Sequence, residues 1–330
     1  MAPRGRIRPV TRREQAATEG RDRLTEVRAA EGAPMAPFDW LLMLSAAGIW
    51  GSSFLFMDVA LRFEHPGLVA WLRPGLGLCF LALVPGAWRP VERSDLPTIG
   101  LLGLLWMAIP LSMFPLAQTW IDSSIAGMMN SGMPVMTLVA GATFFGVRTH
   151  RLQVVGVVIG ILGMVMVGIP TAAGGADGAV ATGALGVFLV VVAISCYGLA
   201  ANIAGPLQRR YGSPAVLVRV LVVATVATMP WGLVGLTDSD FAWSAVGSNL
   251  AVGLGGTGVA YVAAATLIGR VGPVRMSAVT YAVPVVAAVL GVVVLDESLG
   301  IWELGGLLIL MAGAWMTTRV GPRSVGTPSD

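Results

Sequence analysis

The sequence predicts an all-α polytopic membrane protein whose ten transmembrane helices form two inverted five-helix repeats. Three observations lead to this prediction: the composition, the placement of Arg, and an internal repeat. Of the 330 residues, 55% are hydrophobic and 12% are charged, whereas about 25% of the residues in an average soluble domain are charged. A soluble fold of this size would expose more charge than the chain contains, so we expect the apolar stretches to lie in a lipid bilayer.

The chain begins with a polar segment and continues as a series of apolar spans. Residues 1–38 contain eight Arg and no apolar run, which is typical of a disordered cytoplasmic tail. A helix needs roughly 20 apolar residues to cross a bilayer. By this criterion ten spans follow, at residues 39–61, 67–84, 98–119, 124–146, 152–169, 183–205, 214–236, 245–268, 274–295 and 301–319.

The positions of the 21 basic residues, all of which are Arg, support this number of spans. With the N-terminus in the cytoplasm, the eight Arg of the tail and ten others lie in inner segments. Arg62 lies in an outer loop, and Arg73 and Arg219 lie within spans. This asymmetry follows the positive-inside rule. We therefore expect a multi-pass protein of the cell membrane with both termini in the cytoplasm.

An internal repeat appears at a constant offset of 150 residues. Each half contains five spans, and because five is odd, the second copy must enter the membrane from the opposite side. Inverted repeats are typical of secondary transporters. We assign the repeats to 39–169 and 183–319, followed by a short cytoplasmic tail at 320–330. The matched pairs are Gly103 with Gly253, Pro134 with Pro284, Val139 with Val289, Gly141 with Gly291, Gly156 with Gly306, Gly163 with Gly313 and Met166 with Met316.

Several short runs are similar to those of a known family. The first span contains IWGSSF at residues 49–54, the fourth span contains SIAG, Pro134 and FFG, and the ninth ends in LDESL at 295–299. In this order and spacing they resemble EamA-type transporters of the drug/metabolite transporter superfamily. The resemblance implies ten helices in two inverted halves around a central pathway for a small organic solute. Val147 departs from the family pattern, in which the first copy usually carries Glu at this corner.

Arg73 is a candidate for the solute pathway, because a charge inside a span is a functional candidate by default. The resembled family also often has an Arg near this point of its second helix. The alternative is that Arg73, roughly 9 Å from the predicted start of its span, snorkels back to the interface. Snorkelling is the favoured interpretation for Arg219. Asp58 lies four residues before Arg62, which predicts a surface ion pair rather than a proton-coupling carboxylate.

Polar side chains flank two prolines in repeat-equivalent spans. A proline inside a helix frees a carbonyl group, and polar groups beside such a kink suit a solute site at the bilayer midplane. Hydrogen bonds between helices are the competing interpretation. The residues are Asn130, Ser131 and Pro134 in the fourth span and Thr280, Tyr281 and Pro284 in the ninth.

Five further polar or aromatic residues lie near the centres of spans. Aromatic belts place Trp and Tyr at the ends of spans, so central positions favour a pathway lining. These residues are Trp50, Ser53, Tyr197, Asn202 and Tyr261.

Together these features predict a secondary transporter that moves a small organic metabolite or drug-like solute by alternating access. The chain has no Lys, which excludes a Walker A motif and a Schiff-base cofactor. We expect no enzymatic activity, no cofactor, no metal and no nucleic-acid partner. The expected partners are the solute and the bilayer, and the sequence leaves room for a homodimer. The alternative is an intramembrane enzyme that acts on a lipid or isoprenoid substrate, which would need Asp, Glu or His clustered at one membrane face.

Overall fold

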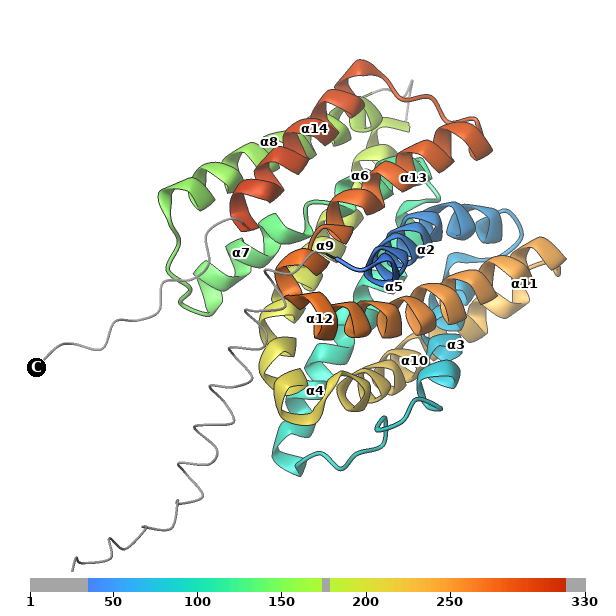
Figure 1. Ribbon diagram of the computed structural model, residues 1–330. Helices are drawn as coiled ribbons and strands as arrows, with labels where there is room; N and C mark the ends of the chain where they lie inside the picture. The colour runs from blue at the N-terminus through green and yellow to red at the C-terminus, as the bar shows by residue number, and fades with distance from the viewer. Residues whose placement is uncertain (1–34, 174–178, 319–330) are drawn as a thin grey trace, which may run out of the picture.

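The computed structural model describes residues 35–173 and 179–318, and within these ranges all regular secondary structure is helical (Figure 1). Most of the tail expected at 1–38 and all of the tail expected at 320–330 lie outside the described residues. The first half contains α2 (Pro37–Leu61), α3 (Pro66–Leu81), the short η1 (Arg93–Asp95), α4 (Leu96–Gly103), η2 (Leu104–Ala108), α5 (Ile109–Ala117), α6 (Ser123–Asn130), α7 (Met133–Phe144) and α8 (Arg151–Ala173).

The second half has a similar order of helices. It begins after the gap in the description and ends shortly before the C-terminus. It contains α9 (Ala179–Tyr211), α10 (Ser213–Thr237), α11 (Trp243–Leu250), η3 (Ala251–Val259), α12 (Ala260–Met276), α13 (Val279–Leu295) and α14 (Ile301–Thr318). The order differs in that α13 is continuous where the first half has the separate helices α6 and α7.

Seven helices in the described ranges are long and apolar enough to cross a membrane. The pair α6 and α7, bent by 44° at a short break, meets the same criterion together. α3 and α13 are apolar helices of 16 and 17 residues. The chain is therefore a multi-pass membrane protein.

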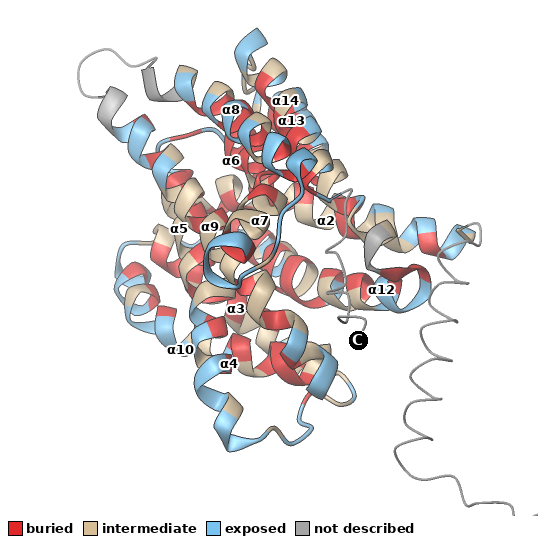
Figure 2. Ribbon diagram, turned by 90° about the vertical axis from the view of Figure 1, so that its left-hand side faces the viewer, coloured by how far each residue is buried: buried red, intermediate tan, exposed pale blue. Residues whose placement is uncertain are grey.

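The surface of the helix bundle is rich in large apolar side chains. Phe188, Val226 and Leu308 are 60%, 61% and 69% exposed. Figure 2 shows exposed residues along the outer faces of α8 and α10, while buried residues face the neighbouring helices. An apolar surface of this extent suits contact with lipid rather than with water.

The fourth predicted span, 124–146, is not one continuous helix. α6 ends at Asn130, and α7 begins at Met133. Pro134 therefore lies in the first turn of α7, where its missing N–H would have no partner within the helix, and not in a helix interior. Pro284, in contrast, lies inside the continuous helix α13. The ninth span also begins later than predicted, at Val279, because a turn at Ser277 and Ala278 separates it from α12. α12 itself is kinked at Gly272, which has a φ of 84°.

Two helices contain a π-helical stretch at equivalent positions of the two halves. η2 joins α4 to α5, and η3 joins α11 to α12. Residues 104–108 of η2 correspond to 254–258 of η3 at the repeat offset of 150 residues. A π-helical turn leaves the regular hydrogen-bond pattern and is frequent at functional sites.

α8 and α14 pack side by side along glycines (Figure 1). A Cβ atom added at Gly163 would collide with the backbone of Leu310, and one added at Gly313 would collide with the backbone of Gly160. Gly163 and Gly313 are matched positions of the sequence repeat. Gly163 and Gly313 therefore each contact the other half of the chain, and only a glycine allows so close an approach.

Candidate solute site

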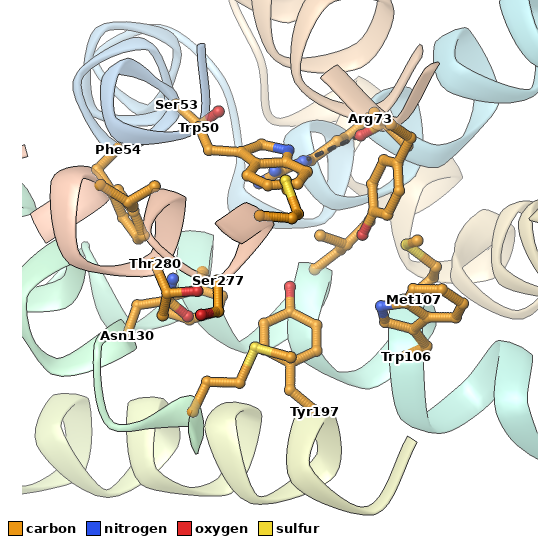
Figure 3. Close-up of a pocket in the computed structure, with 17 residues that line it drawn as sticks. Trp50, Ser53, Phe54, Arg73, Trp106, Met107, Asn130, Tyr197, Ser277 and Thr280 are labelled. Carbon is orange, nitrogen blue, oxygen red and sulfur yellow. Dashed lines mark hydrogen bonds between the residues drawn. The ribbon is translucent and has the colours of Figure 1, made fainter. Parts of the chain in front are cut away.

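A cavity of about 320 Å³ lies between helices of both halves (Figure 3). Its volume falls in the range of small-molecule sites, which is about 300–1,000 Å³. The first half contributes Trp50, Ser53, Phe54, Arg73, Trp106, Met107, Leu111, Phe114, Asn130 and Met133. The second half contributes Tyr197, Thr257, Tyr261, Met276, Ser277, Thr280 and Val283.

Arg73 is the only charged residue among those that line the cavity. Its Nε donates to Thr257 Oγ1 and its Nη1 to Met57 Sδ, both over 3.4 Å. The first of these hydrogen bonds is longer than usual, and thioether sulfur is a weak acceptor. Within the described ranges, no Asp or Glu forms an ion pair with Arg73. The guanidinium group therefore faces the cavity without a countercharge from this part of the chain.

Six aromatic rings form two walls of the cavity. On one side, the ring of Tyr261 makes edge contacts with Trp50, at 5.6 Å between centroids, and with Trp106, at 5.9 Å. On the other side, Phe114 contacts Phe54 edge-on at 5.5 Å and stacks with Tyr197 at 6.1 Å. Aromatic pairs of this geometry contribute about 0.5–1.5 kcal/mol beyond the area that they bury, so these contacts stabilise the arrangement of the rings.

The π-helical stretch η3 helps to position the first wall. The indole Nε1 of Trp50 donates to the carbonyl oxygen of Gly256 over 2.9 Å. This carbonyl belongs to η3, where the irregular backbone departs from the standard helical bonding. A side chain from the first half is thereby fixed to the backbone of the second half, beside Arg73 and Thr257.

A second polar group lies apart from Arg73, at the ends of α6 and α13. Asn130, Ser277 and Thr280 gather there, and the hydroxyl of Tyr197 points toward the space between this group and Trp50 (Figure 3). The side-chain oxygen of Asn130 is buried and accepts no hydrogen bond from another described residue. An unsatisfied acceptor at a cavity wall is costly, so a bound molecule with a donor would find a partner here.

Seven of the twelve residues predicted from the sequence line the cavity: Trp50, Ser53, Arg73, Asn130, Tyr197, Tyr261 and Thr280. Ser131 and Pro134 lie at the break between α6 and α7, and the buried Ser131 hydroxyl donates to Met128 O. Pro284 is buried inside α13. These three residues lie outside the cavity lining and shape its helices.

Asn202 and Tyr281 also lie outside the cavity lining. The amide of Asn202 donates to Thr137 O and Gly198 O, and so joins α9 to α7. The hydroxyl of Tyr281 lies 2.9 Å from Thr318 Oγ1 and joins α13 to α14. For Tyr281, hydrogen bonding between helices was the competing interpretation. For Asn202, predicted only as a pathway residue, such bonds were not anticipated.

The remaining charged residues within or near the spans bond away from the cavity. Arg62 pairs with Asp58 at 2.9 Å, which confirms the predicted surface ion pair. Arg219 donates to the carbonyl oxygens of Ala87 and Arg89 in the loop after α3. Within the described ranges, no three His, Cys, Asp or Glu side chains are grouped as metal ligands would be.

Several lining residues were not singled out from the sequence. Phe54, Trp106 and Phe114 lie in apolar spans, where an aromatic residue can equally face lipid or a helix. Thr257 lies in a π-helical stretch and Ser277 lies at a helix junction, and hydropathy predicts neither irregularity. The fourfold glycine pattern around Thr257, at 253, 255, 256 and 258, is the one hint that was available.

At the opposite end of α6 from Asn130, a carboxylate joins the two halves. Glu297 accepts hydrogen bonds from the backbone N–H groups of Ser123 and Ser124, at 2.8 and 2.9 Å. These groups open α6, so the carboxylate caps the positive end of that helix. Burial and the neighbouring negative charge of Glu297 raise the pKa of Asp122 above its ordinary value.

A second contact between the halves lies on the same side. Both carboxylate oxygens of Glu64 accept hydrogen bonds from Nδ2 of Asn249, at 2.9 and 2.7 Å. Burial raises the pKa of Glu64 above its ordinary value, and the bond from Asn249 offsets part of that rise. In the loops before α3 and after α10, Ser239 Oγ accepts from His65 N.

Comparisons with known proteins agree with this architecture. The chain is 22% identical over 280 residues to an uncharacterized transporter of Archaeoglobus fulgidus, covering 85% of this chain and 98% of the relative. It is 25% identical to YedA, an uncharacterized inner membrane transporter of Escherichia coli, covering 82% and 87%. It is 26% identical to a probable amino-acid metabolite efflux pump of Salmonella typhimurium, covering 86% and 95%.

A solved crystal structure shares the fold, with a TM-score of 0.56 at 20% sequence identity, over 84% of this chain and 95% of that one. The EamA-like transporter family matches the sequence twice, at residues 39–169 and 183–319. These two segments span most of the sequence. The chain therefore belongs to the EamA-like transporter family and is a multi-pass membrane transporter.

Proposed function

We propose that the chain is a ten-helix secondary transporter that moves a small organic metabolite through its central cavity by alternating access. The observation that carries the proposal is the cavity itself, to which both halves contribute lining residues. A site between two halves can face either side of the membrane in turn when the halves rock against each other. The relatives named as amino-acid metabolite efflux pumps suggest amino acids and their derivatives as the first solutes to test.

The packing of the helices supports two inverted halves. α3 packs against α10, and α8 packs against α14, so equivalent helices of the two halves pair with each other. α2 packs against α13, and α9 packs against α7. α9 is the equivalent of α2 in the second half, and α7 belongs to the first-half equivalent of α13, so these two contacts correspond to each other. The π-helical stretches η2 and η3 follow the same symmetry.

The cavity and the contacts around it favour a state that is closed to the outside. Met276 and Ser277 lie at the junction of α12 and α13, which the nearby Arg270 and Arg275 assign to the cytoplasmic side by the positive-inside rule. On the opposite side, the carboxylate of Glu297 ties α13 to α6. We infer that the cavity communicates with the cytoplasm in this state, with both termini cytoplasmic.

The alternative of an intramembrane enzyme has no support from the cavity lining. General acid–base or metal-assisted chemistry on a lipid needs groups such as Asp, Glu or His. None of the residues that line the cavity is of these types. We therefore propose transport without a catalytic step.

The test is flux into proteoliposomes that contain the purified full chain and no ATP. Labelled phenylalanine, N-acetylphenylalanine and 3-phenylpropanoate would be measured with and without the same solute preloaded on the far side. We expect saturable flux for at least one of them, and faster flux after preloading. For N-acetylphenylalanine, whose amide N–H can donate to Asn130, Asn130→Leu should raise the apparent KM, whereas Tyr281→Phe, outside the cavity lining, should leave it within about twofold. Flux that rises linearly with concentration and ignores preloading would indicate a pore and contradict the proposal.

A further inference from the structure

The charge of the cavity is set by one residue. Arg73 is the only charged side chain that lines it, and its two contacts with Thr257 and Met57 are to a hydroxyl and a thioether. Burying a cation without a countercharge is unfavourable. The described residues include no acidic partner for it. A bound anion would supply the missing charge.

The rest of the lining suits an apolar or aromatic body. The rings of Trp50, Tyr261 and Trp106 form one wall, and those of Phe54, Phe114 and Tyr197 form the other. A cavity of about 150 Å³ holds benzene, so the 320 Å³ measured here suits roughly twice that volume. This corresponds to a solute of roughly 10–15 non-hydrogen atoms.

The cavity lining contains no carboxylate for a charged amine. An ammonium ion needs a carboxylate or several strong acceptors when it leaves water, and no Asp or Glu lines the cavity. Electrostatic attraction to the aromatic faces would be opposed by the positive charge of Arg73. The unpartnered oxygen of Asn130 can accept a hydrogen bond from a neutral hydroxyl or amide group instead.

We propose that the preferred solute is a small aromatic or alkyl monocarboxylate without a charged amine, with its carboxylate on Arg73 and its apolar body between the two aromatic walls. A planar guanidinium group binds a carboxylate through two parallel hydrogen bonds. A neutral hydroxyl at the far end of the solute would donate to Asn130. This assignment rests on the proposed function, because it names the class of solute for the same cavity.

The experiment measures the affinity of the purified full chain for a series with one phenyl body and varied charge. The probes are 3-phenylpropanoate, its neutral amide, phenylalanine and phenethylamine, and binding is read by calorimetry. We expect 3-phenylpropanoate to bind at least tenfold more tightly than each of the other three, since a hydrogen bond to a charged group typically contributes a factor of this size. Equal or tighter binding of the amide, phenylalanine or the amine, or no binding of any probe, would overturn the assignment.

Two variants show whether Arg73 causes the preference. Arg73→Gln should bring the ratio between carboxylate and amide close to one, and Arg73→Lys should restore it in part. Arg219→Gln is the matched control, because Arg219 bonds to loop carbonyls outside the cavity, and it should keep the full ratio. A preference that survives in Arg73→Gln would contradict the proposal.

A further probe tests Asn130. 3-(4-Hydroxyphenyl)propanoate carries a phenol group at the end opposite the carboxylate. It should bind more tightly than 3-phenylpropanoate to the wild type, and this gain should disappear in Asn130→Leu. The same gain in both proteins would overturn the placement of the far end at Asn130.

The failure of this assignment can be told apart from failure of the proposed function. If phenylalanine or another member of the series gives saturable flux stimulated by preloading, but the carboxylate is not preferred, the chain is a transporter with a different solute class. If the carboxylate binds with the predicted preference but no probe is carried across the bilayer, the cavity is a binding site and the transport proposal fails.

Discussion

The corner after α7 and the corner after α13 have the same backbone and different chemistry. Gly146 and Asp296, which are 150 residues apart, have φ angles of 65° and 58°. The N–H of Val147 donates to Gly141 O over 3.0 Å, and that of Glu297 donates to Gly291 O over 3.1 Å. Only the second corner carries a carboxylate, which reaches α6 of the other half.

The difference shows how the two halves of one sequence repeat can differ in their contacts. At the repeat offset, Val147 corresponds to Glu297, and residues 273 and 274 correspond to its partners Ser123 and Ser124. Pro273 has no N–H to donate. The carboxylate and one of its two N–H donors are thus missing on the side of Val147. We infer that charge-assisted hydrogen bonds close the side of Glu297 more firmly, and that this favours the state closed to the outside.

The comparison would fail most clearly if the corner after α7 and the corner after α13 lay on the same side of the membrane. Cysteines would be introduced singly at Arg148 and Ser298, in a background without Cys79 and Cys196. Both positions are exposed and repeat-equivalent. The cysteine at 298 should react with an impermeant thiol reagent in intact cells, and the one at 148 only after permeabilisation. The same reactivity at both sites would refute the inverted topology.

The next largest effect is expected at Glu297. In Glu297→Ala, a reporter cysteine at Met133 in the cavity should react about tenfold faster with reagent added from outside, because one hydrogen bond to a charged group contributes about 1.5 kcal/mol or more. The rate in Glu297→Gln should lie between that of the protein with Glu297 and that of Glu297→Ala, because the amide oxygen of Gln still accepts one N–H. Val147→Glu is the control, and it should change the rate less than twofold. An unchanged rate in Glu297→Ala would mean that the contact does not hold this side closed.

The contact between α8 and α14 is a region in which the two halves are alike, and substitution of its glycines tests how closely the helices pack. Gly313→Ala should lower the Tm by several degrees, on the order of 5 °C, because its Cβ would press on the backbone of Gly160. Gly305→Ala on the same helix meets only the end of Met166, at 3.8 Å. It should change the Tm by about 1 °C or less. Thermal unfolding of the purified protein in detergent would measure both, and equal Tm values would contradict the close packing.

The smallest effect is expected at Asp122, beside the carboxylate contact. A raised pKa means that the folded state binds the proton more tightly than the unfolded chain does. The stability that protonation provides is therefore present at acidic pH and is lost as the pH rises through the folded-state pKa. Asp122→Asn should raise the Tm at pH 7.5 by on the order of 1 °C, and this gain should shrink at pH 4. A gain that is larger at pH 4 would contradict the predicted direction.

The all-helical, multi-pass membrane architecture could be predicted from the sequence, because the apolar composition and the long apolar spans report on the bilayer. The inverted topology and the orientation inferred from the repeat and the Arg placement stay predictions. The break at Ser131 and Gly132 and the π-helical stretches could not, because the backbone there departs from a regular helix without a distinct residue pattern. Arg73 could be found because a charge is conspicuous in an apolar span. Trp106 and Phe114 could not, since hydropathy does not distinguish a ring that faces a cavity from one that faces lipid.

The contact of Glu297 illustrates a further limit. Its place in the corner was visible in the sequence, but its partner Ser123 lies 174 residues earlier, and the bond uses the backbone of Ser123 rather than its side chain. Asn202 and Tyr281 had the residue types of a solute site, and their hydrogen bonds to neighbouring helices became apparent only from the packing.

The most direct measurement of alternating access is transport by a chain whose outer side is held closed. Cysteines at Ser124 and Glu297, in the background without Cys79 and Cys196, would be joined by a short, cleavable bifunctional thiol reagent in proteoliposomes. The solute with the largest saturable flux would serve as the probe. We expect crosslinking to stop flux and to leave binding from the cytoplasmic side intact, and we expect cleavage of the linker to restore transport. Undiminished flux in the fully crosslinked protein would contradict a central site that opens to the two sides in turn.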